Sequence, residues 1–311
     1  MRIAVASGKG GTGKTTVSTG LALSLAGENG AGRHDHSQSR SRLLFIDCDV
    51  EAPNAHLFLN PDFQVRIETG PSVPQIDGDA CTYCGRCAEV CEFNAIAVVE
   101  EHVLTFPHLC HGCGSCALNC PEDAINEVPR ATGLLEAGPT PDGLYFTRGI
   151  MNVGEAMAVP IIRELKKWDM GLGREENRKG MESTSWENVI IDVPPGTTCP
   201  VVEAIQGADF VLLVAEPTPF GLHDLRLMVE VVSAMNIPAG VVLNRDGTGY
   251  EDLARFCEEA DLPVMLRIPL DRRIAEGLAR REPLTTIYPE YRDRMREMYE
   301  SMASMVGRNL R

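Results

Sequence analysis

One stretch near the start of the chain limits what the rest can fold into. Residues 2–16 are RIAVASGKGGTGKTT, in which an apolar run with β-branched residues, Ile3–Ala6, passes into a glycine-dense loop. An apolar-periodic segment through Val17, Leu21 and Leu25 follows. A strand, a G-x-x-x-x-G-K-[ST] loop and a helix in this order predict a phosphate-binding loop. Its glycines let backbone N–H groups turn toward the α- and β-phosphates, and the helix presents its positive N-terminus to them.

The loop predicts nucleotide and metal contacts residue by residue. Lys14 is expected to reach the β- and γ-phosphates, and the Thr15 hydroxyl is expected to bind Mg²⁺. ATP or ADP with Mg²⁺ is therefore the predicted ligand. The predicted nucleotide contacts in this stretch are Gly8, Lys9, Gly10, Gly11, Thr12, Gly13, Lys14, Thr15 and Thr16.

Apolar runs that end in acidic residues continue the same pattern. Leu43–Ile46 is followed by Asp47, Cys48 and Asp49, and a second run at 189–191 is followed by Asp192. Ligands of open α/β sheets gather at the carboxyl ends of the strands, so we expect these carboxylates to face the phosphates. Further strands are predicted at 210–215, 240–243 and 264–268, and a helix at 159–168. The chain is thus predicted to be an α/β protein with a doubly wound, mostly parallel sheet.

Two cysteine runs interrupt this pattern, which breaks at about Pro61 and passes through turn-rich residues 70–79. The sequence is CTYCGRCAEVCEFNAI from Cys81 and CHGCGSCALNCPEDAI from Cys110, which makes the two runs an internal repeat. Their spacing, C-x₂-C-x₂-C-x₃-C, is that of bacterial ferredoxins, in which the fourth cysteine of each run ligates the other cluster. One predicted quartet is therefore Cys81, Cys84, Cys87 and Cys120, and the other is Cys110, Cys113, Cys116 and Cys91.

The quartets favour two 4Fe–4S clusters over zinc. Thiolate quartets suit either metal, but structural zinc sites rarely show this interlocked, duplicated run. Pro121 follows the last cysteine of the second run, where the first run has Glu92; neither residue is a predicted ligand. We predict a nucleotide-binding domain formed by residues 1–62 and 131–311, with a small α+β ferredoxin-like domain inserted at 63–130. A hairpin or two short strands over Leu134–Arg148 are expected to return the chain to the main sheet.

The composition of the chain limits the kinds of partner that it is expected to bind. With 311 residues, of which 44% are hydrophobic and 23% charged, the chain can bury at least one large core. Its net charge of −15 argues against unaided binding to nucleic acid or acidic lipid. No charged-then-apolar leader and no apolar run of transmembrane length are present in the sequence, so we expect a cytoplasmic protein without integral membrane association. Eleven cysteines are dense for such a protein unless they hold metal.

The motifs together resemble a known group of ATPases. KGGTGKTT, with Lys9 before the double glycine, IDCDVEAPN and the run VIIDVPPG are similar to the MinD, ParA and nitrogenase-iron-protein group, and the whole chain resembles MinD-superfamily members with an inserted ferredoxin domain. The resemblance implies an ATP-sandwich homodimer in which Lys9 reaches the partner's nucleotide. It also implies that Asp49 orients the attacking water and that Asp47 and Asp192 support Mg²⁺.

The same resemblance implies how the base is held. Asn244, at a strand end, would contact the adenine edge, because its amide both donates and accepts hydrogen bonds. The strand that ends before Pro269 would bring its loop beside the base. The implied catalytic residues are Lys9, Lys14 and Asp49.

Several of these residues have structural alternatives. Lys9 would otherwise be a solvated loop lysine, and Asp47 or Asp49 a strand-end cap. His108 and His111 would either tune the second cluster or be ordinary surface histidines, the reading we favour. Cys199 lies in a place comparable to a cluster-bridging cysteine of nitrogenase iron protein, but we favour a buried thiol there.

Three further segments have simpler expected roles. Methionines at helical spacing, Met295, Met298, Met302 and Met305, are expected to pack on their own domain rather than form a membrane or partner surface. Polar segments at Gly30–Arg42 and Asp169–Glu187 are expected to be surface loops, and Cys48 a buried small residue.

Three classes of function are compatible with the sequence. The first is an ATPase that gates electron delivery to, or iron–sulfur or metal-cofactor assembly on, a client metalloprotein. The second is a spatial organiser of the MinD or ParA kind with a redox-sensing ferredoxin module, and the third is a plain electron carrier. We favour the first, because the insert begins just after Asp47–Asn54 and returns before Asp192–Cys199, so motions driven by the γ-phosphate reach it through both of its connections.

Overall fold

The fold is taken from a computed structural model that describes residues 1–26, 42–167, 186–247 and 249–309. The two predicted polar loops, at Gly30–Arg42 and Asp169–Glu187, fall almost entirely outside these residues. In the described part of the chain, no helix combines the length and the apolar character that crossing a bilayer requires.

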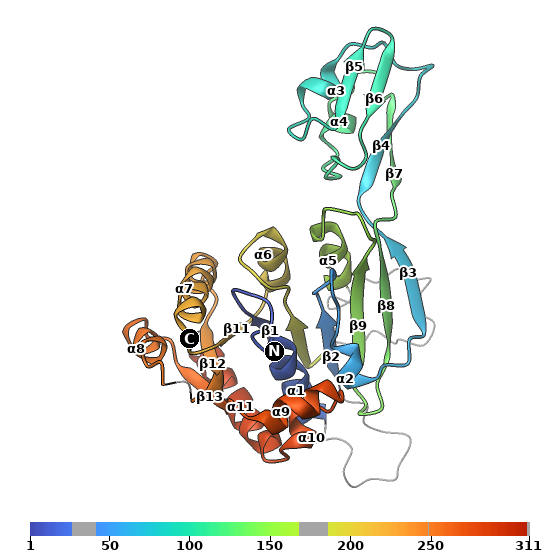
Figure 1. Cartoon of the computed structure of the whole chain (residues 1–311). Coiled ribbons are helices and arrows are strands. Elements are labelled where there is room, and N and C mark those ends of the chain that lie inside the picture. The colour runs from blue at the N-terminus through green and yellow to red at the C-terminus, as the bar shows by residue number, and fades with distance from the viewer. Residues whose placement is uncertain (27–41, 168–185, 248, 310–311) are drawn as a thin grey trace.

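A large twisted sheet forms the body of the molecule (Figure 1). Within the described residues it has nine strands in the order β13-β12-β11-β1-β10-β2-β9-β8-β3. Neighbours from β13 to β9 are parallel, and β8 and β3 extend the β9 edge as antiparallel pairs. The mostly parallel α/β sheet is therefore confirmed. Its strands are β1 (Arg2–Ala6), β2 (Leu43–Asp47), β3 (Val65–Thr69), β8 (Gly133–Pro139), β9 (Tyr145–Met151), β10 (Asn188–Asp192), β11 (Phe210–Ala215), β12 (Ala239–Asp246) and β13 (Val264–Pro269).

Helices cover both faces of this sheet because the central strands are apolar on both sides. Ala4 and Ile46 face one layer of helices, and Ile3 and Phe45 face the other. The first layer is α5 (Val159–Lys166), α6 (Cys199–Ile205), α7 (Pro219–Ala234) and α8 (Asp252–Glu259). The second is α1 (Lys14–Ala26), α2 (His56–Leu59), α9 (Arg272–Ala279), α10 (Leu284–Ile287) and α11 (Tyr291–Asn309).

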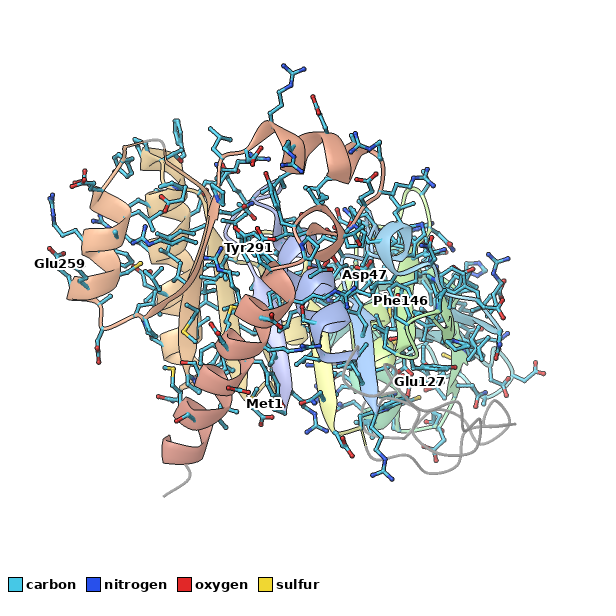
Figure 2. All side chains as sticks on the ribbon, turned by 90° about the horizontal axis from the view of Figure 1, so that it is seen from below. Met1, Asp47, Glu127, Phe146, Glu259 and Tyr291 are labelled. Atoms are coloured by element: carbon cyan, nitrogen blue, oxygen red, sulfur yellow. The ribbon has the colours of Figure 1, made fainter. Side chains whose placement is uncertain are left out.

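The methionines of α11 pack as expected. Met295, Met298 and Met302 are buried in the second layer, and Met305 packs against it partly buried. Figure 2, seen from below, shows α11 lying across this face from Tyr291, whereas Asp47 and Phe146 lie within the body of the domain and Glu259 lies at its outer rim. Gly20 of α1 allows the close approach of α11, because a Cβ there would lie 2.8 Å from the Met295 Cε.

The inserted module begins later in the sequence than expected, because the segment after residue 63 joins the large sheet. The hairpin predicted over Leu134–Arg148 forms as β8 and β9. However, Val65–Thr69, placed in the insert by the boundary at residue 63, is an edge strand of the large sheet and pairs with β8. Its side chains alternate between partly buried and exposed, as expected of an edge strand with one face on the domain.

A small module of residues 70–132 projects beyond β3 and β8 (Figure 1). Its stalk is an antiparallel ladder of β4 (Ser72–Ile76) and β7 (Ile125–Pro129), so part of the segment expected to be turns is a strand. Pro74 is tolerated there because a two-stranded ladder leaves one edge of each strand unpaired. The module also contains α3 (Arg86–Glu89), β5 (Ile96–Val99), β6 (His102–Thr105) and α4 (Ser115–Leu118).

The contact between α1 and α11 generates a stability prediction. Gly20→Val is expected to lower the free energy of unfolding by about 1–3 kcal/mol, because the added methyl groups overpack the site beside Met295. Gly307→Val is the matched control on α11, where a Cβ meets nothing within 4 Å. Urea unfolding of both variants checks this, and equal stabilities would contradict the packing.

Candidate functional site

The glycine-rich loop joins β1 to α1 and is held by a residue from β12. Gly11 and Gly13 have φ values of +78° and +93°, which side-chain-bearing residues rarely adopt. The Asn244 Nδ2 donates a hydrogen bond of 2.6 Å to the Thr12 carbonyl. A Cβ at Gly13 would lie 2.1 Å from that Nδ2 atom, so the position requires glycine. The Asn244 side chain thus fixes the conformation of the loop.

Lys14 and Thr15 lie among the carboxylates predicted from the strand ends. The Thr15 hydroxyl donates to the Asp192 Oδ2 at 2.8 Å. The Lys14 ammonium lies 3.9 Å from the Asp192 Oδ1 and 4.0 Å from the Asp49 Oδ2. These residues come from the first turn of α1, from β10 and from the segment after β2, and they meet because parallel strands end at one edge of the sheet.

Asp47 is buried beside this group and held by backbone donors. Its carboxylate accepts hydrogen bonds from the Asp49 and Ala55 N–H groups at 3.2 and 3.1 Å. Burial raises the pKa of Asp47 well above its ordinary value, and the Asp192 carboxylate raises it further. Burial also raises the pKa of Asp192 and of Asp49, against the opposing effect of Lys14.

These carboxylates fit a divalent cation. Oxygen ligands from Asp, Thr and phosphate are the donors that Mg²⁺ takes in nucleotide sites. The Asp192 Oδ1 is buried without a hydrogen-bond partner, which is the state of an atom that a cation or its bound water would satisfy. The donor set therefore suits Mg²⁺ held by Thr15 and Asp192, with Asp47 behind them.

Lys9 lies on the same loop but points to a different acid. Its Nζ is 3.5 Å from the Glu216 Oε2, and the other Glu216 oxygen pairs with the Arg245 guanidinium. Sequence reasoning assigned no role to Glu216 or Arg245. Glu216 directly follows β11, just as the aspartates follow or end their strands, and this position was the signal that could have identified it.

The residues expected near the base occupy different settings. Asn244 is buried and commits one amide N–H to the loop, which sequence reasoning did not anticipate. Pro269 lies at the end of β13 and pairs in register with Asp246. Contact of either residue with adenine stays a prediction.

The eight repeat cysteines surround two separate cavities in the small module. One cavity is lined by Cys81, Cys84, Cys87 and Cys120, and lies beside Ile76 and Ile125 at the far end of the stalk; we call it the distal cavity. The second, the proximal cavity, lies beside Ser72 and Pro74 near the large sheet. It is lined by Cys91, Cys110, Cys113 and Cys116. Each predicted quartet is thus brought together by the fold.

Backbone amides donate to the sulfurs in a pattern that repeats between the two runs. In the first run, Tyr83 N–H donates to Cys81 Sγ at 3.4 Å and Ala95 N–H to Cys91 Sγ at 3.3 Å. In the second run, the equivalent Gly112 and Ala124 N–H groups donate to Cys110 and Cys120 at 3.4 and 3.3 Å. Such bonds favour the thiolate form that binds metal and help to set cluster potentials.

Burial acts in the opposite direction on several of these thiols. It raises the pKa of Cys110, and the Gly112 N–H opposes that shift. It also raises the pKa of Cys87 and Cys116. Among the described residues, no three His, Cys, Asp or Glu side chains are arranged to hold a single metal ion. A 4Fe–4S cluster differs from a single ion in its needs, and the four cysteines that line each cavity would supply its thiolate ligands.

The predictions for the remaining cysteines and histidines have different outcomes. Cys48 is buried as expected, and burial raises its pKa strongly. Cys199 is exposed at the start of α6, so the expected buried thiol is wrong there; the first turn of a short helix leaves the side chain outside the core. His111 stacks on Phe93, with ring centroids 3.8 Å apart, and both line the proximal cavity. The His108 Nδ1 lies 3.0 Å from the Arg130 Nη2.

Comparisons with known proteins bear on the large domain. A family model described as the CobQ/CobB/MinD/ParA nucleotide binding domain matches residues 3–284. An uncharacterized protein of Methanocaldococcus jannaschii is 32% identical over 98% of this chain and 97% of its own. An iron-sulfur cluster carrier protein of Aquifex aeolicus is 24% identical over 93% of this chain, which covers 62% of that protein.

Solved structures agree with the topology of the sheet. The septum site-determining protein MinD of Pyrococcus horikoshii, complexed with Mg-ADP, superposes with a TM-score of 0.55 at 19% identity, covering 98% of this chain and 97% of that one. MinD of Pyrococcus furiosus gives a TM-score of 0.54 at 19% identity, with 96% and 98% covered. At these identities the likeness establishes the fold alone.

The bond from Asn244 to the loop generates a prediction. Asn244→Ala is expected to lower the free energy of unfolding by about 1–3 kcal/mol without nucleotide, because the buried Thr12 carbonyl loses its donor. ATP affinity is expected to fall as the loop loosens. Asn126→Ala, an exposed change on β7, is the control and is expected to stay within about 0.5 kcal/mol. Urea unfolding and ATP titration check this, and unchanged stability in Asn244→Ala would contradict it.

Proposed function

The chain belongs to the CobQ/CobB/MinD/ParA nucleotide-binding domain family, and on that premise we propose that it is an ATP-hydrolysing homodimer whose nucleotide state controls two 4Fe–4S clusters. The clusters would serve electron delivery to a client metalloprotein. One observation carries the proposal: two cavities, each lined by one predicted cysteine quartet, lie on a module that projects from the nucleotide domain.

The position of the module supports the coupling. β3 is antiparallel to β8, which is antiparallel to β9, so β3 runs in the same direction as β9 and β2. Its carboxyl end, where the stalk begins, is therefore at the same edge of the sheet as Asp47, Asp192 and the glycine-rich loop. Three strand spacings separate β2 from β3, a distance of about 14 Å.

The nucleotide site would work by positioning and charge. Lys14 and the loop N–H groups would hold the phosphates, and Thr15 and Asp192 would hold Mg²⁺, which neutralises the charge that develops on the phosphoryl oxygens. Asp49 would orient the attacking water. Its carboxylate already faces Lys14, so phosphate binding to Lys14 would release Asp49 for that role.

Lys9 would act across a dimer interface. In the structure its ammonium is paired with Glu216 of the same chain, and about a third of its side chain is exposed. Closing two copies over the nucleotides would exchange this partner for a phosphate of the other copy. Because phosphate offers a charged acceptor in a drier site, the exchange favours the closed dimer.

The cluster arrangement supports electron delivery over cofactor assembly. When bound, 4Fe–4S clusters accept and donate single electrons. Each run gives three cysteines to one cavity and one to the other, so releasing one cluster would open the ligand sets of both runs. Clusters held in this way are suited to stay resident. Assembly on a client would instead require iron that leaves readily.

The nucleotide half of the proposal is tested with two lysines. Lys14→Ala is expected to lose ATP binding and turnover while both clusters stay loaded, because the cavities lie on a separate module. Lys9→Ala is expected to keep ATP binding but lose ATP-dependent dimerisation and hydrolysis. Lys167→Ala, a partly exposed lysine paired with Glu164, is the control. Phosphate release and analytical ultracentrifugation measure these effects, and full turnover in Lys9→Ala would show that this lysine does not act in trans.

The cluster half is tested by iron content after anaerobic purification. Cys84→Ser and Cys113→Ser are each expected to lower iron from about eight to about four atoms per chain, since each removes a ligand of one 4Fe–4S cluster. Cys199→Ser is the control, as an exposed cysteine outside the module, and is expected to leave iron unchanged. Unchanged iron in the first two variants would overturn the ligand assignment. Rapid iron transfer to an apo-protein acceptor would contradict electron delivery and favour assembly.

A further inference from the structure

An ion pair joins the module to the nucleotide domain. The Arg130 Nη1 and Nη2 atoms donate to the Glu155 Oε2 and Oε1 at 3.0 and 2.6 Å, which is a bidentate pair. Both side chains are mostly buried, at 17% and 15% exposed. The Arg130 Nη2 also lies 3.0 Å from the His108 Nδ1, and since a guanidinium has no acceptor, that ring nitrogen accepts. Bidentate pairs of this kind fix orientation as well as distance.

Arg130 and Glu155 stand on opposite sides of the base of the stalk. Arg130 directly follows β7, and its N–H donates to the Pro71 carbonyl at 3.0 Å, which closes the stalk. Glu155 lies just after β9, in a turn where its N–H donates to Asn152. The Asn152 N–H in turn donates to the Thr132 carbonyl at 2.9 Å. The pair therefore clamps the stalk to the chain that leaves β9.

The end of β9 is tied to the segment that carries Asp49. The Met151 N–H donates to the Val50 carbonyl at 2.8 Å, and Val50 directly follows Asp49. Gly149 packs against the same residue, because a Cβ there would lie 2.7 Å from the Val50 Cγ1. With no free space between them, a shift of the Asp49 segment on nucleotide binding would move the end of β9 as well.

On the module side, the clamp reaches the proximal cavity. His108 lies two residues before Cys110, which lines that cavity. Gly112 packs on the stalk, since a Cβ there would lie 2.9 Å from Pro71 Cβ and from the Ser72 carbonyl oxygen. The distal cavity instead takes its walls from the other end of the ladder, at Ile76 and Ile125.

From these contacts we propose that Arg130 and Glu155 are positioning residues that transmit the nucleotide state to the proximal quartet and not to the distal one. The route runs from Asp49 through Val50, Met151 and the Glu155 turn to Arg130 and His108. The inference rests on the proposed function, because it requires both bound nucleotide and loaded clusters. It adds which cluster responds and which residues carry the response.

The test is an EPR-monitored redox titration of the full-length, anaerobically purified protein. It is run without nucleotide, with Mg-ADP, and with Mg²⁺ and the non-hydrolysable analogue AMPPNP. Cys113→Ser and Cys84→Ser assign the proximal and distal signals. AMPPNP is expected to shift the midpoint potential of the proximal signal and to leave the distal one in place. Glu155→Gln and Arg130→Gln are expected to remove more than half of that shift, while AMPPNP still binds.

Matched variants separate this role from simple stabilisation. Arg272→Gln breaks an exposed ion pair with Glu276 within α9, away from the stalk and from both cavities, and it is expected to keep the full shift. The charge-swapped double variant, Arg130→Glu with Glu155→Arg, is expected to restore part of the shift. If Arg130→Gln fails to fold, as judged by circular dichroism and iron content, Glu155→Gln decides the outcome.

The possible results are distinguishable. Iron content and AMPPNP binding are measured on the same sample, so their absence counts against the proposed function and against this inference with it. With both present, equal shifts of the two clusters, no shift at all, or a full shift in Glu155→Gln would each overturn the inference while leaving the proposed function standing.

Discussion

The Lys14 ammonium offsets the repulsion between carboxylates that meet at one edge of the sheet. Three carboxylates meet there because the neighbouring strands β2 and β10 end at the same level, and two of the three, Asp47 and Asp192, are fully buried. Burial and mutual repulsion raise their pKa values, and Lys14, with 7% of its side chain exposed, is the cation placed within 4 Å of two of them. A buried charge is costly unless it is paired, so the edge retains an excess of negative charge that a divalent cation would relieve. The suitability of this edge for a divalent cation thus follows from how the strands are arranged.

The same arrangement explains why a second module is attached where it is. A strand that runs parallel to β2 delivers the chain to the nucleotide edge, and β3 does so at the border of the sheet. Attached at the opposite edge, the stalk would be separated from the phosphates by the whole length of the strands. At this edge it lies beside the segment after Asp49, and backbone bonds from Met151 and Asn152 join the two. Proximity of the base of the stalk to the glycine-rich loop is therefore a property of the topology rather than of any single contact.

The sequence was informative wherever local chemistry decides the structure. The glycine-rich loop, the buried strands and the sorting of eight cysteines into two cavities follow from spacing, because turns and ligand runs are local. The sequence was uninformative where the structure depends on contacts between segments that are far apart along the chain. VRIET at 65–69 alternates apolar and polar residues as a strand does, but its place at the edge of the large sheet depends on pairing with β8, which lies far along the chain. Asn244 suits a base contact by its chemistry, yet its bond to Thr12 depends on how β12 lies against the loop. The exposure of Cys199 likewise depends on what packs over α6.

Crossed sharing of the cysteines gives the module a property that bears on its link to the large domain. Because each cavity takes ligands from both runs, a module with its clusters bound would move as one body, and a displacement at the stalk would leave the geometry inside it unchanged. Such a displacement would alter only the contacts between the module and the large domain. The proximal cavity is lined by Ser72 and Pro74 at the clamped end of the stalk, whereas the distal cavity is lined by Ile76 and Ile125 at the opposite end of the same ladder. If the module moves as a rigid body, its surroundings change only where it contacts the large domain, so the proposed response would be confined to the cavity nearest that contact.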